Sequence, residues 1–490
     1  MKKIYLSKSK YCRAIQCNKM LWLDKNKPEE RDELDKQAVL DNGTKVGELA
    51  KQLFGKYTDI EYNEDLFKMI YNTEEALKNF PNIITEASFE YKNNFCSIDI
   101  LKNNGKTVEI YEVKSSTEIR DIYLDDISYQ FYILKRLGYK IIKASIVYIN
   151  NKYIRNGELN LQQLFNIEDI TDIVLEKQKE IEIKIQEINK YMKQEVEPEQ
   201  EIGMQCFKPY QCQFWRYCTK HLPEHNVFKI RKMHKDKAIK LYYDGKAGFK
   251  DLLEEKMNWK YKQQIEFEEF NYEPHIDKQK IREFMKNLYY PIYFLDFETM
   301  QQAIPEFENS KPYQQIPFQY SLHYIEKEDG KLLHKEFLAE SGIDPRRKLA
   351  EQLIKDIPKD VCVTAYNMMF EKGRIKELAE IFPDLSEHLM NIHDHIQDLM
   401  IPFSERMYYC KKMQGSYSIK YVLPALFPNE PELDYHNLPL IHNGGEAMDI
   451  FPKIKDMSKE EQEKVRYGLL KYCELDTYAM VKVWEKLKEI

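Results

Sequence analysis

Two stretches of alternating apolar and polar residues, separated by an Asn-Asn-Gly tract, constrain the fold of this chain most strongly. They are Phe95–Leu101 and Thr107–Lys114, and the tract between them is typical of a hairpin turn. Alternate side chains of a strand lie on opposite faces, so Glu112 and Lys114 share one face. We therefore predict a β-hairpin that carries Asp99 on its first strand and a glutamate–lysine pair on its second.

The charged residues of this hairpin suit divalent-metal chemistry. Two carboxylates on adjacent strands can share one metal ion, and a lysine beside them can orient or activate a water molecule. Glu86 supplies a third carboxylate upstream of the hairpin. This combination is what hydrolysis of a phosphodiester requires. The alternative is a solvated strand edge with chance charges, because Glu-Val-Lys alone matches many strands.

Cysteine spacing gives a second signal. The chain has nine cysteines; Cys206, Cys212 and Cys218 follow one another closely, and Cys17 lies near the N-terminus. No signal peptide or transmembrane run is evident, so we expect a cytoplasmic protein whose clustered thiols bind a metal rather than form disulfides. Four thiolates suit an iron–sulfur cluster or a zinc ion, although the five residues between successive thiols exceed zinc-knuckle spacing. The alternative is a set of buried cysteines without a ligand.

Together with the later run Asp126-Ile-Ser-Tyr-Gln130, these motifs resemble the RecB-like nucleases of the PD-(D/E)XK class. One cysteine before the core and three after it resemble the iron–sulfur branch of that class, which includes the CRISPR-associated RecB-like nucleases. The resemblance spans about residues 4–222 and implies a restriction-endonuclease-like αβ core. Many relatives carry a histidine on an early helix, whereas this chain has none before residue 221.

The same resemblance implies a role for each residue of the motifs. The metal ligands would be Glu86, Asp99 and Glu112, and the catalytic residues would be Lys114 and Gln130. The ligands of a 4Fe–4S cluster, which would tie the two ends of the domain together, would be Cys17, Cys206, Cys212 and Cys218.

The second half of the chain has an acid set of its own. A strand pattern ends in Asp296-Phe-Glu298, whose alternation places both carboxylates on one face. Further on, a strand runs into a helix that begins near Glu371, and a helical stretch near the C-terminus carries Tyr472 and Asp476 one turn apart. Four carboxylates from distant segments can hold two divalent ions about 4 Å apart for in-line attack on a phosphate. The tyrosine can position the attacking water.

In this order the motifs resemble the DnaQ-like exonucleases of the RNase H fold, in their tyrosine-bearing subclass. The resemblance covers residues 289–490 and implies a mixed-sheet 3′→5′ exonuclease domain that uses Mg²⁺ or Mn²⁺. The usual middle motif ends in aspartate, a place that Glu371 takes here, and Asp398 is a rival for that role. The implied metal ligands are Asp296, Glu298, Glu371 and Asp476, with Tyr472 as a catalytic residue.

Residues 223–288 are predicted to form a helical connector between the domains at 1–222 and 289–490. This segment holds the clearest basic cluster of the chain, which is either a nucleic-acid contact or an ordinary solvated helix face. The cluster comprises Lys229, Arg231, Lys232, Lys235, Lys237 and Lys240.

Hydrophobic periodicity and loop signals complete the prediction. The predicted helices are Cys12–Leu23, Asp35–Phe54, Asp125–Leu137 and 174–194, and a further strand is Ile141–Ile149. The resemblance to the DnaQ-like exonucleases also implies a helix over residues 416–427. We expect His393 and His395 to form a polar turn rather than a metal site. We expect His436 and His442, with the Asn-Gly-Gly turn that follows, to form a loop over the second acid set.

Composition is compatible with this organisation. A chain of 490 residues with 43% hydrophobic content can form two α/β domains, and a net charge of −7 neither supports nor excludes a nucleic-acid partner. We interpret the chain as a two-site nuclease acting on DNA, with single-stranded ends as the expected substrate and no membrane partner. The alternatives are an RNA exonuclease and a non-catalytic iron–sulfur scaffold that binds nucleic acid.

Overall fold

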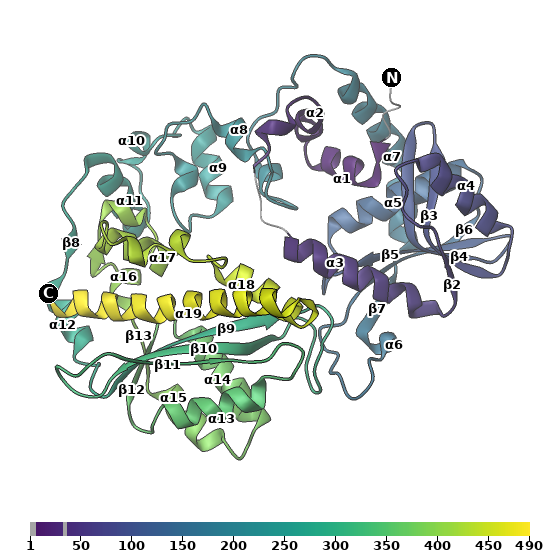
Figure 1. Cartoon of the computed structure of the whole chain (residues 1–490). Coiled ribbons are helices and arrows are strands. Elements are labelled where there is room, and N and C mark those ends of the chain that lie inside the picture. Colours follow the sequence, from purple (N-terminus) through teal and green to yellow (C-terminus); the bar gives the residue numbers. More distant parts are fainter. Residues whose placement is uncertain (1–5, 33–36) are drawn as a thin grey trace. The chain divides into compact units, whose positions relative to one another are not determined.

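The computed structural model describes residues 6–32 and 37–490, without the side chains of residues 37–41 (Figure 1). The chain forms two compact units, residues 1–222 with 302–313, and residues 223–301 with 314–490. Each is a mixed α/β unit with its own sheet and hydrophobic core. Residues 223–288, which we expected to form a connector, belong to the second unit.

A seven-stranded mixed sheet lies at the centre of the first unit, in the order β2-β3-β4-β5-β6-β7 with β1 parallel to β4. Strands β3, β4 and β5 are antiparallel neighbours, whereas β5 and β6 are parallel. The predicted hairpin is confirmed, and Asn104 N donates to Thr107 O at 2.9 Å in its turn. The strands are β1 (Leu6–Ser7), β2 (Tyr57–Asp59), β3 (Asn82–Tyr91), β4 (Asn94–Asn103), β5 (Val108–Lys114), β6 (Ile141–Ile149) and β7 (Phe165–Asp169).

The helices of the first unit correct one prediction. The prediction of one continuous helix over Cys12–Leu23 is wrong. Cys17 has an extended backbone (φ −163°, ψ 117°) and separates two helices. The first two residues of the predicted helix Asp35–Phe54 lie outside the described residues. The helices are α1 (Lys8–Gln16), α2 (Asn18–Asn26), α3 (Gln37–Ala50), α4 (Leu66–Leu77), α5 (Asp121–Arg136), α6 (Leu161–Leu164), α7 (Thr171–Lys193) and α8 (Trp215–Thr219).

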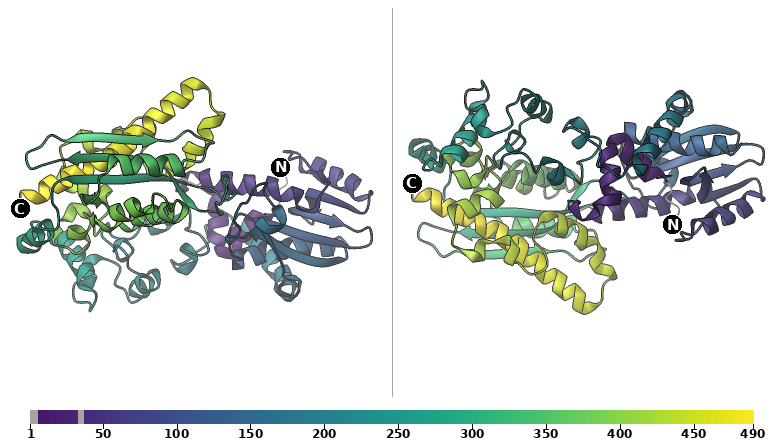
Figure 2. Two further views of the ribbon diagram at one scale, coloured as in Figure 1. Left: turned by 90° about the horizontal axis from the view of Figure 1, so that it is seen from below. Right: turned by 90° about the horizontal axis from the view of Figure 1, so that it is seen from above.

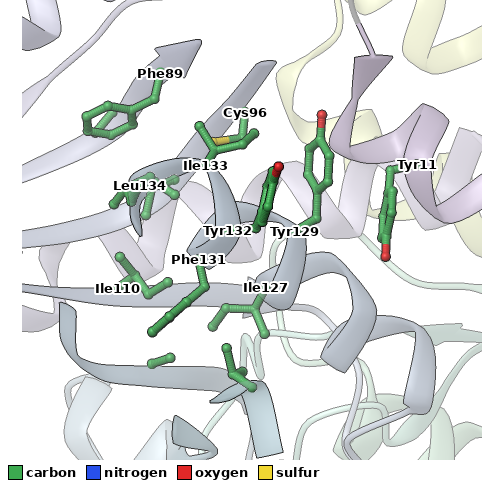
Figure 3. Packing of buried hydrophobic residues seen from close by; sticks show 14 of the residues in the cluster. Tyr11, Phe89, Cys96, Ile110, Ile127, Tyr129, Phe131, Tyr132, Ile133 and Leu134 are labelled. Atoms are coloured by element: carbon green, nitrogen blue, oxygen red, sulfur yellow. The ribbon is translucent and has the colours of Figure 1, made fainter. Parts of the chain in front are cut away.

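Helix α5 is the centre of the first core, since 11 of its 16 residues are buried, and several of them are shown in Figure 3. Ile127, Phe131 and Leu134 of α5 are buried in the same cluster as Ile110 of the sheet. On another side of α5 the ring of Tyr129 stacks on that of Tyr11 from α1, with 4.6 Å between ring centroids. This helix therefore ties the N-terminal segment to the strands that carry the first acid set.

The second unit has a five-stranded sheet in the order β11-β10-β9-β12-β13. Strands β11, β10 and β9 are antiparallel, whereas β9, β12 and β13 are parallel. The strands are β9 (Ile292–Gln301), β10 (Gln315–Ile325), β11 (Leu333–Leu338), β12 (Cys362–Ala365) and β13 (Ile396–Asp398), and a separate pair is formed by β8 (His275–Ile276) and β14 (Tyr408–Tyr409).

Helices cover both faces of this sheet (Figures 1 and 2). On β9, Tyr293, Leu295 and Phe297 pack with α13–α15, and Phe294 packs with Trp484 of the long C-terminal helix α19. The helices are α9 (Lys235–Tyr243), α10 (Phe249–Leu252), α11 (Trp259–Phe270), α12 (Lys278–Met285), α13 (Arg346–Asp356), α14 (Met369–Ile381), α15 (Ser386–Asp394), α16 (Ile401–Ser404), α17 (Ile419–Leu426), α18 (Gly444–Ile450) and α19 (Lys459–Lys488).

Candidate functional site

Three acidic residues of the second unit form a compact cluster. Asp296 and Glu298 occupy the same β9 face as Phe294, because the strand has a period of two, and α19 covers that face. Asp476 projects from α19, and one oxygen of each of the three carboxylates lies within 4.8 Å of the other two. Among the side chains of residues 6–32 and 42–490, this is the only group of three or more acid, histidine or cysteine side chains that meets this distance.

The electrostatics of this cluster favour a bound cation. Burial, followed by repulsion from Asp476, raises the pKa of both Asp296 and Glu298 well above the usual range. Burial also raises the pKa of Asp476 to about 6. Carboxylates that repel one another in a buried site are stabilised in their charged form by a divalent ion between them.

Glu371 lies in the first turn of α14, and its negative charge contributes to the raised pKa of Asp296. It is buried, and its Oε2 atom has no hydrogen-bond partner among the described residues. Burial raises its pKa to about 8, with a further contribution from Asp398. A buried carboxylate oxygen without a partner is a ready metal ligand.

Asp398, the alternative candidate for the middle metal ligand, is engaged in hydrogen bonds to the backbone. Its carboxylate accepts hydrogen bonds from the backbone nitrogens of Asn367 at 2.9 Å, Met368 at 3.2 Å and Met400 at 2.9 Å. These bonds hold the turn that leads into α14, where Asn367 has a left-handed φ of 78°. The geometry therefore assigns Asp398 to positioning α14, and leaves Glu371 available to the acid cluster.

Two tyrosines border the cluster. Tyr472 lies one turn before Asp476 on α19, as the sequence predicted, and its side chain is buried. Tyr435 donates a hydrogen bond from its hydroxyl to Asp476 Oδ1 at 2.7 Å. Sequence reasoning missed Tyr435, because its loop carries no regular spacing relative to the acid motifs.

Lys420 is a second residue that sequence reasoning missed. It lies on α17, within the predicted helix 416–427, and its Nζ atom is 5.5 Å from the ring centroid of Tyr435 and 6.0 Å from that of Tyr472. Its charge lowers the pKa of both Glu298 and Asp476 against the effect of burial. The exposed ammonium group therefore stands at the edge of the acid cluster without an ion-pair partner in the described part of the chain.

Lys420 and Tyr435 line a cavity of about 1100 Å³, whereas Asp296, Glu298 and Asp476 are not among its lining residues. Its lining includes Lys412, Lys420 and Tyr435, together with His436 and His442 from the loop expected over the second acid set. The start of α18 comes so close that a Cβ atom at Gly444 would lie 3.5 Å from Glu298 Oε2 and 3.8 Å from the Tyr472 hydroxyl. The prediction that His393 and His395 form a polar turn is wrong for His393, which lies in the last turn of α15, with His395 at the C-cap. His393 Nδ1 hydrogen bonds to Asp394 Oδ1 at 2.7 Å and His395 Nδ1 to the Asn391 carbonyl at 2.8 Å.

The first unit brings the hairpin acids together around two lysines. Lys114 Nζ lies 2.6 Å from Glu112 Oε1 and 2.7 Å from Asp126 Oδ2, and Lys8 Nζ lies 3.0 Å from Glu112 Oε1 and 3.2 Å from Asp99 Oδ1. Burial raises the pKa of Glu112 to about 7, with Asp126 and Asp99 adding to the rise. Burial alone would raise the pKa of Asp126, but the lysines hold it below its usual range.

Gln130 and Glu86 complete the first site. Gln130 donates from Nε2 to Glu112 Oε2 at 2.6 Å, while its Oε1 atom is buried without a partner among the described residues. Glu86 has a left-handed φ of 56° and interrupts the β3–β4 ladder opposite Asp99. Burial raises its pKa to about 7, and Asp99 adds to the rise. The sequence analysis did not identify Lys8 or Asp126 as members of this site. Asp126 could have been found, because it begins the motif that ends at Gln130, whereas no motif contains Lys8.

The four predicted cysteine ligands line one small cavity of about 10 Å³. Cys17 meets Cys206, Cys212 and Cys218 there, with Phe214 and Trp215 in the lining. Tetrahedral zinc would hold its sulfur ligands about 3.8 Å apart. No three of these four sulfurs, all in the described residues, lie within 4.8 Å of one another. The arrangement is wider than a zinc site.

An ionic clasp holds the two cysteine-bearing segments together. Glu197 accepts from Lys19 at 2.8 Å, from Lys27 at 2.8 Å and from the Tyr217 hydroxyl at 2.6 Å. Lys19 and Lys27 belong to the segment after Cys17, whereas Tyr217 precedes Cys218. Contacts between protein side chains therefore hold the two cysteine-bearing segments together.

The predicted basic cluster lies in the second unit, on α9 and the segment before it. All six of its side chains are exposed. The Arg231 guanidinium lies 4.5 Å from the ring centroid of Tyr421, and Lys232 Nζ lies 4.5 Å from that of Tyr417. These rings flank Lys420 in sequence, so the cluster packs on the segment that also reaches the acid site.

Comparison with known proteins gives a partial match. Residues 293–418 match a family described as a domain of unknown function, DUF2779. The chain is 29% identical over 208 residues to uncharacterized protein MG366 of Mycoplasma genitalium and 26% identical over 223 residues to uncharacterized protein UU173 of Ureaplasma parvum. The matches cover 39% and 41% of this chain and 31% of each relative. The chain thus spans about a third of the length of these relatives. None of the helices described here combines the length and apolar character needed to cross a bilayer.

Proposed function

We propose that this chain is a metal-dependent nuclease with two separate active sites that hydrolyses phosphodiester bonds of DNA, with single-stranded ends as its substrate. The observation that carries the proposal is the acid cluster of β9 and α19, to which the buried Glu371 of α14 is electrostatically coupled, and which adjoins Tyr435 and Lys420 in the lining of a cavity. DNA repair and defence against foreign DNA are the settings that such an activity suits.

The second unit fits an RNase H-like, DnaQ-type exonuclease domain. An antiparallel β11-β10-β9 group continued by parallel β12 and β13 is compatible with that fold. Asp296, Glu298 and Asp476 would hold Mg²⁺ or Mn²⁺, since both are hard ions that prefer carboxylate oxygens, and the unpartnered Glu371 oxygen offers a fourth ligand. When bound, the ions would activate a water molecule and offset the charge of the phosphate.

Two side chains of this site have tasks of their own. The Tyr472 hydroxyl is placed to orient the attacking water, because it lies one turn from Asp476 and near the metal-binding oxygens. Lys420 would bind a phosphate oxygen at the mouth of the cavity, since its ammonium group is exposed and lacks an anionic partner. The arginine–tyrosine and lysine–tyrosine pairs of the basic cluster suit a single strand, whose phosphates and bases contact cations and rings.

The first unit fits a RecB-like nuclease core. Glu86, Asp99 and Glu112 would hold the divalent ion, and the orphaned Oε1 atom of Gln130 supports a polar ligand at that place. Lys114 is held by Glu112 and Asp126, so its ammonium group is positioned to orient a water molecule or a phosphate.

For the four cysteines we propose a 4Fe–4S cluster rather than a zinc ion. The four thiols come from both ends of the first unit, they are spread more widely than a zinc ion requires, and aromatic side chains shield them. When bound, the cluster would fasten the α1–α2 segment to the α8 region. Anaerobically purified protein should then be brown.

End-labelled DNA and RNA, digested with Mg²⁺ or Mn²⁺, test the proposal. Wild type is compared with Lys114→Ala, with Asp296→Asn and with the double variant. The proposal expects each single variant to lose one cleavage pattern and the double variant to lose both. Cleavage by the double variant at the wild-type rate would refute it, and a preference for RNA would favour the RNA exonuclease alternative.

A further inference from the structure

We propose that Lys8 occupies the metal position of the first acid site, so that this lysine and a divalent ion bind there in competition. The inference rests on the proposed function of that site and goes beyond it, since it assigns a residue that controls when the site holds metal.

The position of the Lys8 ammonium group is that of a bridging cation. Its Nζ atom lies 3.2 Å from Asp99 Oδ1, 3.0 Å from Glu112 Oε1 and 3.2 Å from Glu112 Oε2. The two carboxylates come from adjacent strands, and a shared divalent ion would sit between the same oxygens. The ammonium group therefore supplies the charge that an ion would supply.

Lys114 does not duplicate this role. Its shortest contacts are with Glu112 Oε1 and Asp126 Oδ2, and Gln130 joins the same pair from the other side. Among the ion pairs of the described residues, Lys8 is the only partner of Asp99. The other carboxylate oxygen of Asp99 accepts a hydrogen bond from Val113 N at 2.7 Å. Removal of Lys8 would thus leave Asp99 without a cation and leave Lys114 in place.

The backbone around Lys8 is held by buried contacts. Strand β1 pairs with β4, and the Leu6 carbonyl accepts from the buried Tyr129 hydroxyl at 2.5 Å. Ser7 caps α1 by accepting from Lys10 N at 3.3 Å, and Tyr11 stacks on Tyr129 one turn later. This anchoring directs the Lys8 side chain to the two carboxylates.

The two cations cannot share these oxygens. A small divalent ion binds carboxylate oxygens at about 2.1 Å, closer than the ammonium nitrogen lies, and two positive charges at one site repel each other. Binding of the ion therefore requires Lys8 to swing away. The measured metal affinity of the first site should include the free energy of breaking these ion pairs.

The test is calorimetric titration of Mn²⁺ into the full chain carrying Asp296→Ala and Asp476→Ala, which disable the second site. In this parent, Lys8→Met should raise the Mn²⁺ affinity at least about tenfold, because removing a like charge from the site favours the ion. Lys8→Arg keeps the charge and should restore the parent affinity. Lys106→Met removes an exposed lysine from the β4–β5 turn and should also match the parent.

Two controls keep the result interpretable. Circular dichroism checks the fold of each variant, and Lys8→Gln provides a second, polar replacement that should also bind Mn²⁺ more tightly. If Lys8→Met and Lys8→Gln bind no more tightly than the parent while Asp99→Ala abolishes binding, the competition is refuted and the metal site stands. If no variant binds Mn²⁺, both the competition and the proposed metal site fail.

Discussion

The two acid sites of this chain balance their negative charge in different ways. In the first unit, Lys8 and Lys114 pair with Asp99, Glu112 and Asp126 at 2.6–3.2 Å. In the second unit, Asp296, Glu298 and Asp476 repel one another, and the nearby Lys420 contributes only a longer-range attraction. The two lysines thus offset much of the negative charge of the first site, whereas the acids of the second site have no lysine within ion-pair distance among the described residues. Under the proposed function, a metal ion would have to displace Lys8 from the first site, whereas it would meet no such lysine in the second.

The largest expected effect concerns the frame of the first unit. Cys212→Ala should remove the iron–sulfur colour and destabilise the first unit by several kcal/mol, because metal binding energy at a structural site is folding energy. The second unit, which has its own core, should keep its melting transition. Visible absorbance and scanning calorimetry measure both effects.

Cys12→Ala is the matched control for that change. Cys12 is on α1 in the same unit but does not line the cavity of the four thiols. It should retain the colour. Equal loss of colour in both variants would argue against the assignment of the ligands.

The next largest effect tests the charge balance itself. In protein stripped of divalent ions, Asp126→Asn should lower the stability of the first unit by about 3 kcal/mol, because it breaks a buried ion pair. Asp296→Asn should instead raise the stability of the second unit, because it relieves repulsion. Opposite shifts of the two melting transitions support the comparison, and shifts of the same sign would break it.

A third prediction sharpens the chemical difference between the units. Tyr472→Phe keeps the ring and deletes the hydroxyl, so release of nucleotides by the second site should fall about 100-fold while Mn²⁺ affinity is unchanged. Tyr435→Phe provides a comparison, since its hydroxyl bonds to Asp476 and its loss should weaken metal binding as well. A rate unaffected by Tyr472→Phe would remove this tyrosine from the mechanism.

The smallest effect is a pH dependence confined to the second unit. Burial and, to a smaller extent, the charge of His334 lower the pKa of His323 to about 4 against the opposing effect of Glu474. The unfolded chain therefore binds the proton more readily between about pH 6.5 and 4, and stability falls as the pH falls through that range. The contribution of His323 to the stability of the second unit should fall by about 2 kcal/mol between pH 7 and pH 5, while the acid cluster, whose pKa values are raised, contributes with the opposite sign.

Urea unfolding at pH 7 and pH 5 measures this term. His323→Asn, which cannot titrate, should reduce the pH dependence of the second unit and leave that of the first unit unchanged. An identical pH dependence in wild type and variant would show that His323 does not carry it.

The parts predictable from sequence were those set by local periodicity. The hairpin, β6 and the pairing of Asp296 with Glu298 on one face follow from a strand period of two. The break at Cys17 was not predictable, because the helical pattern continues across it. The choice between Glu371 and Asp398 also needed the structure, since only the backbone amides of the turn before α14 show that Asp398 is already engaged.

Residues that act across long sequence distances left the weakest signals. Lys8 reaches Glu112 over 104 positions, and Tyr435 reaches Asp476 over 41. Neither belongs to a repeated or spaced motif, so nothing in the linear sequence indicates the partner. Tertiary packing of α1 on α5, and of the loop before α18 on α19, creates both contacts.

The central claim is that the acid cluster of the second unit hydrolyses phosphodiester bonds with divalent metal. The most direct measurement is Mn²⁺-dependent release of mononucleotides from a 3′-labelled single strand by the full chain carrying Lys114→Ala. Asp329→Asn serves as the control, because it makes the same change in an exposed turn where φ is 56°. We predict steady release by the Lys114→Ala chain and its Asp329→Asn derivative, and a loss of at least about 10³-fold with Asp296→Asn. Equal release by the Asp296→Asn chain would contradict the account.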